Sequence, residues 1–175
     1  MQTHTVIVTG ASGVGKTTAV RILEARDNPG VSCFYYDSIG VPTPEEMKRD
    51  YGGGEQWQVR ATQWWLSELN ELDSATRVAV LDGQIRPSHM NVAAKSIGRA
   101  VHAILLDCEP NAREHRLKTG RGQPELATKD MGVWAAYLRG QAEVLGFPIV
   151  DTSRLDPQQV ADRVEELIGR FVTLD

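Results

Sequence analysis

Residues 10–17, GASGVGKT, match the pattern GxxxxGK[ST], in which glycines, a lysine and a hydroxyl residue have fixed spacing. Glycines allow backbone conformations that direct successive N–H groups at phosphate oxygens. Lys16 adds a point charge for the outer phosphates, and the Thr17 hydroxyl can ligate magnesium. We therefore predict a site for a nucleoside triphosphate with Mg²⁺. The residues expected to form it are Gly10, Ala11, Ser12, Gly13, Val14, Gly15, Lys16, Thr17 and Thr18.

A second stretch whose pattern suggests chemistry is VAVLDGQIRPS, at residues 78–88. Its four leading apolar residues predict a buried strand that ends at Asp82. An unpaired ion in a dry interior is very costly, so we expect this carboxylate at the end of the strand, beside a partner. Ligands gather at the carboxyl edge of a parallel sheet, where Asp82 would serve magnesium together with Thr17. Arg86 would then reach toward whatever receives the phosphoryl group.

Switches, motors and kinases all bind nucleotides through such a loop, so the loop alone does not define a function. A motor ATPase usually has a glutamate directly after the magnesium-side aspartate, whereas this chain has Gly83. A GTP switch needs a guanine-reading NKxD tetrapeptide, which the sequence lacks. DSIG at residues 37–40 matches DxxG, but without the guanine-reading motif we interpret the match as coincidence. The pattern favours a kinase.

Asp37 follows a predicted strand that we expect to lie beside the phosphate loop. An acceptor hydroxyl benefits from a positioned base, whereas a phosphate acceptor is already anionic and would be repelled by a carboxylate. Asp37 therefore favours an acceptor that carries a hydroxyl group. A structural role in an Asx turn or a helix cap is the alternative interpretation.

Positive charge is concentrated late in the chain, although the protein as a whole is acidic. Arg113, Arg116, Lys118 and Arg121 lie within nine residues, and the first two share a helix face at spacing i, i+3. Arginine side chains can stabilise the charge that phosphoryl transfer spreads over the equatorial oxygens. A lid over about residues 113–130 would also exclude water from the reaction. The alternative is a solvated basic helix end without such a function.

The candidate site residues must be positioned by a sheet and helices. Short apolar runs alternate along the chain with helical patterns, which is typical of βαβ units. We expect strands at residues 5–9, 32–36, 77–82, 101–107 and 147–150. Helices are expected to begin near Lys16, Glu55, Pro87, Pro110, Thr128 and Pro157. The 175 residues contain no evident linker, so we expect one α/β domain over residues 1–175, with an acceptor-binding cap at about residues 38–76.

Local patterns also predict how individual helices pack and end. The helix over residues 128–146 should stop at Gly146, and its apolar face consists of Met131, Trp134, Ala135, Leu138, Ala142 and Leu145. The last helix should begin with Asp156 as N-cap and Gln159 in a capping-box position. In the cap, helical spacing predicts a face packed on the core, although one tryptophan of this face lining the acceptor pocket is the alternative. That face contains Trp57, Ala61, Trp64, Trp65, Leu69 and Leu72.

Composition limits the partners and the compartment. A formal net charge of −4 argues against a protein that coats nucleic acid or an anionic membrane. No apolar run approaches the roughly 20 residues of a membrane helix, and the N-terminal residues do not resemble a signal peptide. Cys33 and Cys108 are expected to be free, buried thiols, and the histidines lack metal-ligand spacing. We expect a cytoplasmic monomer or homodimer without a nucleic-acid or membrane partner.

Several stretches resemble those of small P-loop kinases. LDGQIRP is similar to the DGxxR stretch of adenylate kinases, with Asp82, Gly83 and Arg86 at matching positions. Residues 105–122 resemble the strand, helix and arginine-rich lid entry of adenylate, shikimate and gluconate kinases, and residues 149–168 resemble their last strand, adenine-contacting loop and closing helix. The place of Asp37 is similar to that of an acceptor-binding aspartate in shikimate kinase and chloramphenicol phosphotransferase.

The resemblance implies a three-layer P-loop NTPase fold, with a five-stranded parallel sheet in the order 2-3-1-4-5, helices on both faces and a short lid. It also implies that ATP and Mg²⁺ bind, and that Thr152 and Ser153 lie in the loop that contacts the adenine base. The sequence departs from the kinase pattern in two ways: Arg116 and Arg121 are one residue further apart than the arginines of RLxGR, and the lid lacks cysteines.

The residues and the resemblance together predict an ATP- and Mg²⁺-dependent kinase that phosphorylates a small molecule, more readily on a hydroxyl than on a phosphate. A nucleoside monophosphate kinase is one alternative, and a regulatory ATPase acting on a macromolecule is another. Nucleosides, sugars, hydroxy acids and antibiotics are candidate acceptors. The candidate catalytic residues are Lys16, Asp37, Arg86, Arg113, Arg116 and Arg121.

Overall fold

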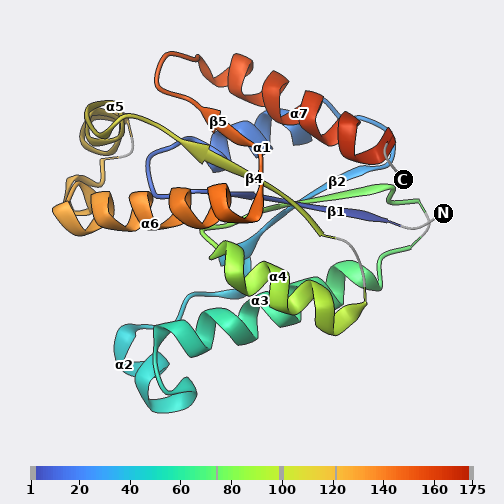
Figure 1. The fold of residues 1–175 in the computed structure, drawn as a ribbon, viewed down its shortest axis with the longest axis horizontal. Coiled ribbons are helices and arrows are strands. Elements are labelled where there is room, and N and C mark those ends of the chain that lie inside the picture. The colour runs from blue at the N-terminus through green and yellow to red at the C-terminus, as the bar shows by residue number, and fades with distance from the viewer. Residues whose placement is uncertain (1–2, 74, 99–100, 121, 174–175) are drawn as a thin grey trace.

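Five parallel strands form one sheet in the order β2-β3-β1-β4-β5, in a computed structural model that describes residues 3–73, 75–98, 101–120 and 122–173 (Figure 1). The predicted fold class and strand order are confirmed. The strands are β1 His4–Thr9, β2 Val31–Tyr35, β3 Val78–Asp82, β4 Val101–Asp107 and β5 Ile149–Asp151. The largest difference from prediction is at β5, which begins two residues later than expected, because Phe147 N still donates to Ala142 O at the end of α6.

Helices cover both faces of the sheet, which makes the expected three layers. Helices α1 Lys16–Ala25 and α7 Pro157–Thr173 pack together on one face, and α3 Gly54–Asn70 and α4 Pro87–Ile97 pack together on the other (Figure 1). Helix α6 Lys129–Leu145 contacts α4, β4 and β5. The central strand β1 is buried on both sides, which explains its continuous apolar run.

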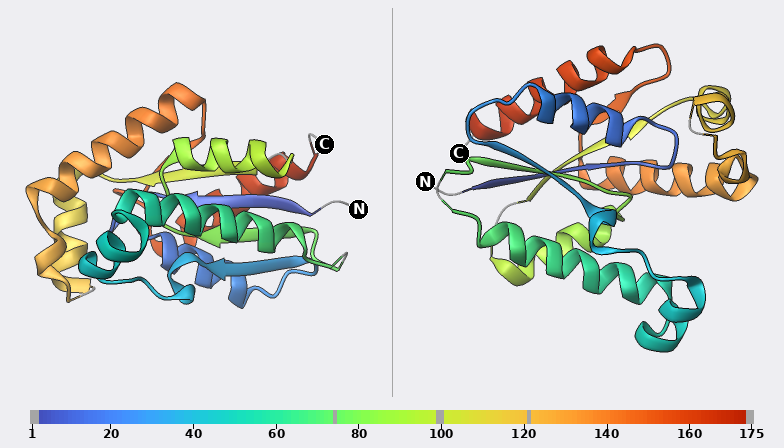
Figure 2. Two further views of the ribbon diagram at one scale, coloured as in Figure 1. Left: turned by 90° about the horizontal axis from the view of Figure 1, so that it is seen from below. Right: turned by 180° about the vertical axis from the view of Figure 1, so that it is seen from behind.

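The short segments gather at one end of the molecule, where the strands have their carboxyl ends. Figure 2 shows α2 and the segment around α5 at this end, together with the start of α6, while both chain termini lie at the opposite end. Between β2 and α3 lie the turns η1 Tyr36–Ile39, α2 Pro44–Glu46 and η2 Met47–Tyr51. Between β4 and α6 lie α5 Pro110–His115, η3 Arg116–Gly120 and η4 Pro124–Leu126. The fold therefore brings residues 38–51 of the predicted cap and the predicted lid to the ligand-binding edge of the sheet, whereas α3, the rest of the predicted cap, packs on a face of the sheet.

The helix ends follow their local sequence signals. Asp156 Oδ1 accepts a hydrogen bond from Gln159 N at 2.9 Å, and Gln159 Oε1 accepts one from Asp156 N at 3.0 Å, so the predicted capping box is confirmed. Helix α6 ends before Gly146, as predicted. The prediction that Leu145 belongs to the packed apolar face of this helix was wrong, because its side chain is 37% exposed. The chain reverses at Gly146, and Phe147 packs against the core instead.

Burial corrects two further expectations. Trp57 and Trp65 pack into the core as predicted, but Trp64 is 46% exposed, because it lies one residue around the helix from the buried face. Cys108 is buried, whereas Cys33 is only half-buried, and both thiols are free. Across the described residues, the helices do not combine the length and the hydropathy that crossing a membrane requires.

Candidate functional site

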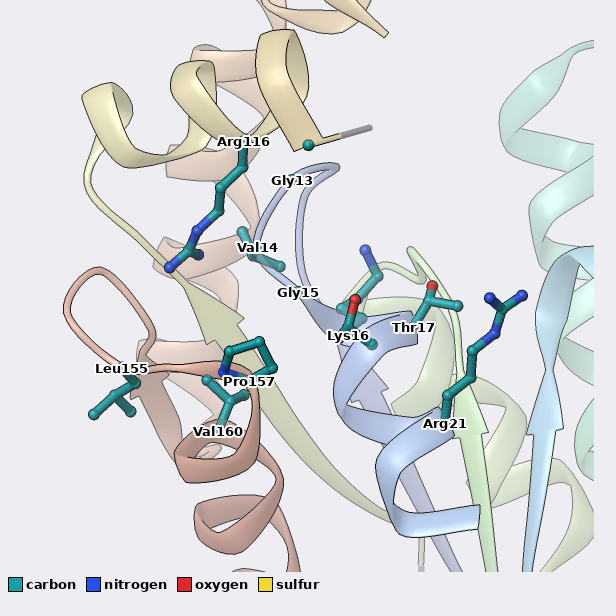
Figure 3. Close-up of a pocket in the computed structure, with 12 residues that line it drawn as sticks. Gly13, Val14, Gly15, Lys16, Thr17, Arg21, Arg116, Leu155, Pro157 and Val160 are labelled. Atoms are coloured by element: carbon teal, nitrogen blue, oxygen red, sulfur yellow. The ribbon is translucent and has the colours of Figure 1, made fainter. Parts of the chain in front are cut away.

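The phosphate loop borders a pocket of about 500 Å³ between α1, α7 and the segment after α5 (Figure 3). Its lining comprises residues 13–18 together with Arg21, Arg116, Gly120, Leu155, Pro157 and Val160. Gly10 and Ala11 are buried at the base of the loop, and Ser12 donates a hydrogen bond to Gln84 Oε1 at 3.1 Å. Six of the nine residues predicted at the phosphate loop therefore line the pocket, namely residues 13–18, and the other three belong to the part of the loop that supports it. Arg21, on α1 one turn after Thr17, is a lining residue that the sequence reasoning missed.

All three glycines of the loop have a positive φ, of 146° at Gly10, 85° at Gly13 and 98° at Gly15, and the last two differ in their surroundings. A β-carbon at Gly13 would lie 2.9 Å from Leu117 Cγ and 3.0 Å from Arg113 Cγ, whereas one at Gly15 would meet no described atom within 4 Å. The loop thus packs tightly against the segment after β4 at Gly13 and has open space at Gly15. A side chain at Gly13 is therefore disfavoured twice, by the positive φ angle and by this contact.

The two glycines make a matched pair of variants. We expect Gly15→Ala to lower the free energy of unfolding by about 1–2 kcal/mol, through backbone strain alone. Gly13→Ala should lose about 1–3 kcal/mol more, because its methyl group also overlaps Leu117 and Arg113. Urea unfolding of both variants without nucleotide measures the difference. Equal stabilities would mean that the segment after β4 moves away from the loop at no cost.

Lys16, Thr17 and Asp82 lie together at the start of α1 and the end of β3. Thr17 Oγ1 donates to Asp82 Oδ2 at 2.6 Å, and Asp82 is only 6% exposed. The buried Lys16 directs its Nζ to Ala11 O at 3.1 Å. A hydroxyl and a carboxylate are hard oxygen ligands of the kind that Mg²⁺ prefers, and Mg²⁺ usually takes its other ligands from phosphates and water. The donor set of Thr17 and Asp82 therefore fits magnesium, and the described residues contain no cluster of three or more acidic, histidine or cysteine side chains that would hold another ion.

Asp37 lies at the same edge of the sheet as Asp82. In the register of β2 with β3, Tyr35 is paired with Asp82, and Asp37 follows two residues later in η1. A β-carbon at Gly83 would lie 2.7 Å from Tyr36 Cβ, so the chain before Asp37 passes directly over the end of β3. The Asp37 side chain is exposed and does not cap η1, whose N-cap is Tyr35. The position of the Asp37 side chain is therefore more consistent with contacting a ligand than with capping a helix.

Arg86 connects the two helices that flank this edge. Its Nη1 donates to Gln58 Oε1 on α3 at 2.8 Å, and its guanidinium carbon lies 4.6 Å from the centre of the Trp134 ring on α6. Gln58 is itself held, because its Nε2 donates to Gln84 O at 3.1 Å. Trp134, which the helical pattern assigned only to an apolar face, thus contacts a candidate site residue through a cation–π interaction.

His89, one turn after Arg86, was missed by the sequence reasoning. Its Nε2 lies 3.7 Å from Glu55 Oε1 of α3, and its Nδ1 is buried without a hydrogen-bond partner in the described part of the chain. Burial, and secondarily the positive charge of Arg86, lowers the pKa of His89 below its ordinary value despite the opposing effect of Glu55. The imidazole is therefore neutral at pH 7. The only sequence signal for this residue was its spacing of three from Arg86 at the start of a helix.

The arginines predicted for the lid lie in different surroundings. Arg116 donates to Thr152 Oγ1 at 2.8 Å and to Thr152 O at 2.6 Å, while Thr152 Oγ1 donates to Val14 O at 3.0 Å. Arg116 therefore borders the pocket at the phosphate loop (Figure 3). It is joined to the loop through the fully buried Thr152. Ser153 donates from its backbone N to Asp151 Oδ1 at 2.9 Å, and it does not line the pocket. Arg121 lies outside the described residues.

Arg113 is 6% exposed and does not line the pocket at the phosphate loop. It borders a different cavity, between α5 and the start of α6. Arg113 in α5 and Arg116, the first residue of η3, thus border two separate cavities, although they are only three residues apart. Their spacing suggested that both arginines stabilise the charge of the transferred phosphoryl group, but their different surroundings do not support one common role.

Neither a protein-family model nor a curated protein sequence matches the chain. Solved structures match it along nearly its whole length at low identity. The tunicamycin resistance protein of Deinococcus radiodurans matches with a TM-score of 0.67 and 21% identity over 96% of both chains. Shikimate kinase from Acinetobacter baumannii, in complex with shikimate, matches with a TM-score of 0.64 and 15% identity over 96% of this chain and 94% of that one. Thymidylate kinase from Candida albicans matches with a TM-score of 0.60 and 12% identity over 97% and 92%. The chain has the fold of the P-loop kinases.

Proposed function

We propose that this P-loop kinase fold carries an ATP- and Mg²⁺-dependent phosphotransferase, which transfers the γ-phosphoryl group to a hydroxyl of a small molecule. The observation that carries the proposal is the juxtaposition, at one edge of the sheet, of the Thr17–Asp82 pair with Asp37 and Arg86. A nucleotide site alone would serve any class of P-loop protein, whereas a carboxylate and a guanidinium beside it suit an acceptor.

The residues of the nucleotide side have separable roles in this proposal. Gly13, Gly15 and Lys16 bind the phosphates, and Thr17 and Asp82 hold Mg²⁺, which when bound neutralises charge on the phosphates. Arg116 forms the wall of the nucleotide pocket, where Thr152 keeps it in place. Arg121 is retained as the candidate clamp on the transferred phosphoryl group.

On the acceptor side, Asp37 orients the hydroxyl and takes its proton, as a base within reach of the reacting oxygen must. Arg86 is presented between Gln58 and Trp134 with its orientation fixed, so it can bind an anionic or strongly polar group of the acceptor without a large loss of side-chain freedom. The neutral imidazole of His89 lies on the same side and supplies a further polar contact.

A nucleoside monophosphate is the second candidate acceptor, and Arg86 is the observation that favours it. Within the described residues Arg86 is held by an amide and an aromatic ring, and no carboxylate forms an ion pair with it. Its charge is therefore available for a phosphate. The exposed carboxylate of Asp37 at the same edge of the sheet is the reason for ranking a hydroxyl acceptor first.

An ADP-release screen over nucleosides, nucleotides, sugars, hydroxy acids and nucleoside antibiotics tests the proposal, with mass spectrometry of the products. We expect little ATP turnover by the protein alone and a large increase with the true acceptor, because a kinase site positions an acceptor in place of water. The Lys16→Ala variant, assayed in parallel, controls for contaminating kinases. Turnover that rises with protein or nucleic acid, without a phosphorylated small molecule, would instead indicate a regulatory ATPase.

A further inference from the structure

A second cavity of about 530 Å³ lies between α5 and the first turns of α6, and it shares no lining residue with the nucleotide pocket. We call it the α5–α6 groove. Much of its lining is apolar, including Pro110, Leu117, Met131 and Val133. This volume is within the range of small-molecule sites. Binding of a ligand in this groove would not depend on the proposed phosphotransferase function.

The guanidinium of Arg113 is the unexplained group of this groove, because the side chain is nearly buried while its nitrogen atoms keep some contact with solvent. The side chain is 6% exposed, and it passes Gly13 and ends beside Gly132, where a β-carbon would lie 3.7 Å from Arg113 Nη2. Among residues 3–73, 75–98, 101–120 and 122–173, no acidic side chain forms an ion pair with Arg113 and no group accepts a hydrogen bond from its guanidinium. A charged side chain that is 6% exposed keeps little of its hydration, and no acidic group compensates for the loss here. The guanidinium is therefore well placed to bind an anion at the groove, whose lining includes Arg113.

The start of α6 adds positive potential to the same cavity. Thr128 caps this 17-residue helix by accepting a hydrogen bond from Met131 N at 3.1 Å, and the positive end of the helix dipole lies at Lys129, which also lines the groove. Glu114 is the acidic lining residue, and its carboxylate is already occupied by the ammonium group of Lys118. Asp130, also in the first turn, is exposed and does not line the groove.

We propose that the α5–α6 groove binds a small organic anion that has one charged group and an apolar body. The charged group pairs with Arg113 and the start of α6, and the body covers the apolar wall. Inorganic phosphate or chloride would satisfy the charge alone, but neither would displace water from the apolar side chains. Binding energy is therefore expected from both parts of one ligand.

Titration of the whole ¹⁵N-labelled protein with hexyl phosphate tests this site, with 1-hexanol and inorganic phosphate as probes that each lack one part. We expect saturable amide shifts at residues 129–133 with hexyl phosphate, and weaker binding of both control probes. Adding ATP in excess should leave these shifts unchanged, because the two cavities are separate. Shifts confined to residues 10–18, or equal binding of hexyl phosphate and 1-hexanol, would overturn the proposal.

Three variants test the position of the site and the role of the Arg113 charge. Val133 is 64% exposed at the groove and Val144 is 86% exposed on the same helix outside it, so Val133→Asp and Val144→Asp are a matched pair that leaves the core intact. We expect the Kd for hexyl phosphate to rise about tenfold or more in Val133→Asp and in Arg113→Met, and to stay unchanged in Val144→Asp. Wild-type affinity in Val133→Asp would contradict the site even if Arg113→Met failed to fold.

Discussion

Replacing Lys16 by alanine is expected to reduce kcat/KM for phosphoryl transfer by about 10²- to 10³-fold or more, the usual effect of removing one group that stabilises transition-state charge. Lys16 is 8% exposed at the start of α1, where the helix dipole and the loop amides favour the same anion. In this low-dielectric position, the ammonium charge acts on the outer phosphates with little screening. Steady-state kinetics with the acceptor found in the ADP-release screen measures the loss.

The fold should survive this substitution. The hydrogen bond from Lys16 Nζ to Ala11 O has a charged donor, a kind of interaction that contributes about 1.5–3 kcal/mol, and a domain of this size is stable by roughly 5–15 kcal/mol. Thermal unfolding should show a lowered midpoint with a single cooperative transition. Lys95→Ala, at an exposed position of α4, is the matched control and should leave both activity and stability unchanged. A Lys16→Ala protein with near wild-type transfer would remove the phosphate loop from the mechanism.

Replacing Asp37 by asparagine is expected to reduce kcat by about 10²- to 10⁴-fold if the acceptor is a hydroxyl, because the amide cannot take the proton. KM for the acceptor should change little, since asparagine still accepts a hydrogen bond from the hydroxyl. The exposed position of Asp37 in η1 makes a folding defect unexpected. Kinetics with acceptor and ATP varied in turn separates the two parameters.

The same variant distinguishes the two kinds of acceptor. If the natural acceptor is a phosphate, the loss of a nearby negative charge should maintain or increase transfer. Asp73→Asn is the control, because Asp73 is exposed away from the site and its amide replacement still accepts from Ala75 N. Near wild-type transfer to a hydroxyl acceptor by Asp37→Asn would show that Asp37 is not the base.

Local features of the chain were predicted from the sequence because they depend on neighbouring residues. The strand β1 was evident from its continuous apolar run, and α7 from Asp156 and Gln159, whose hydrogen bonds join residues three apart. The phosphate loop was evident for the same reason, since its glycines and Lys16 act within a few residues of one another. The strand order followed only from resemblance to the small kinases, because no residue pattern within one strand specifies its neighbour.

The surroundings of the arginines could not be predicted in this way. Arg86 meets Gln58 and Trp134, and Arg116 meets Thr152, through contacts between elements that are far apart in the chain. Helical spacing shows which residues share a face, but not which other element that face will meet. Arg113 and Arg116 share a face and have different environments, because one packs toward α6 and the other toward the end of β5. The sequence by itself therefore determined the phosphate loop and the elements that hold it. Only the packing of the helices on the sheet decided which charges lie together, because that packing depends on contacts across the whole domain.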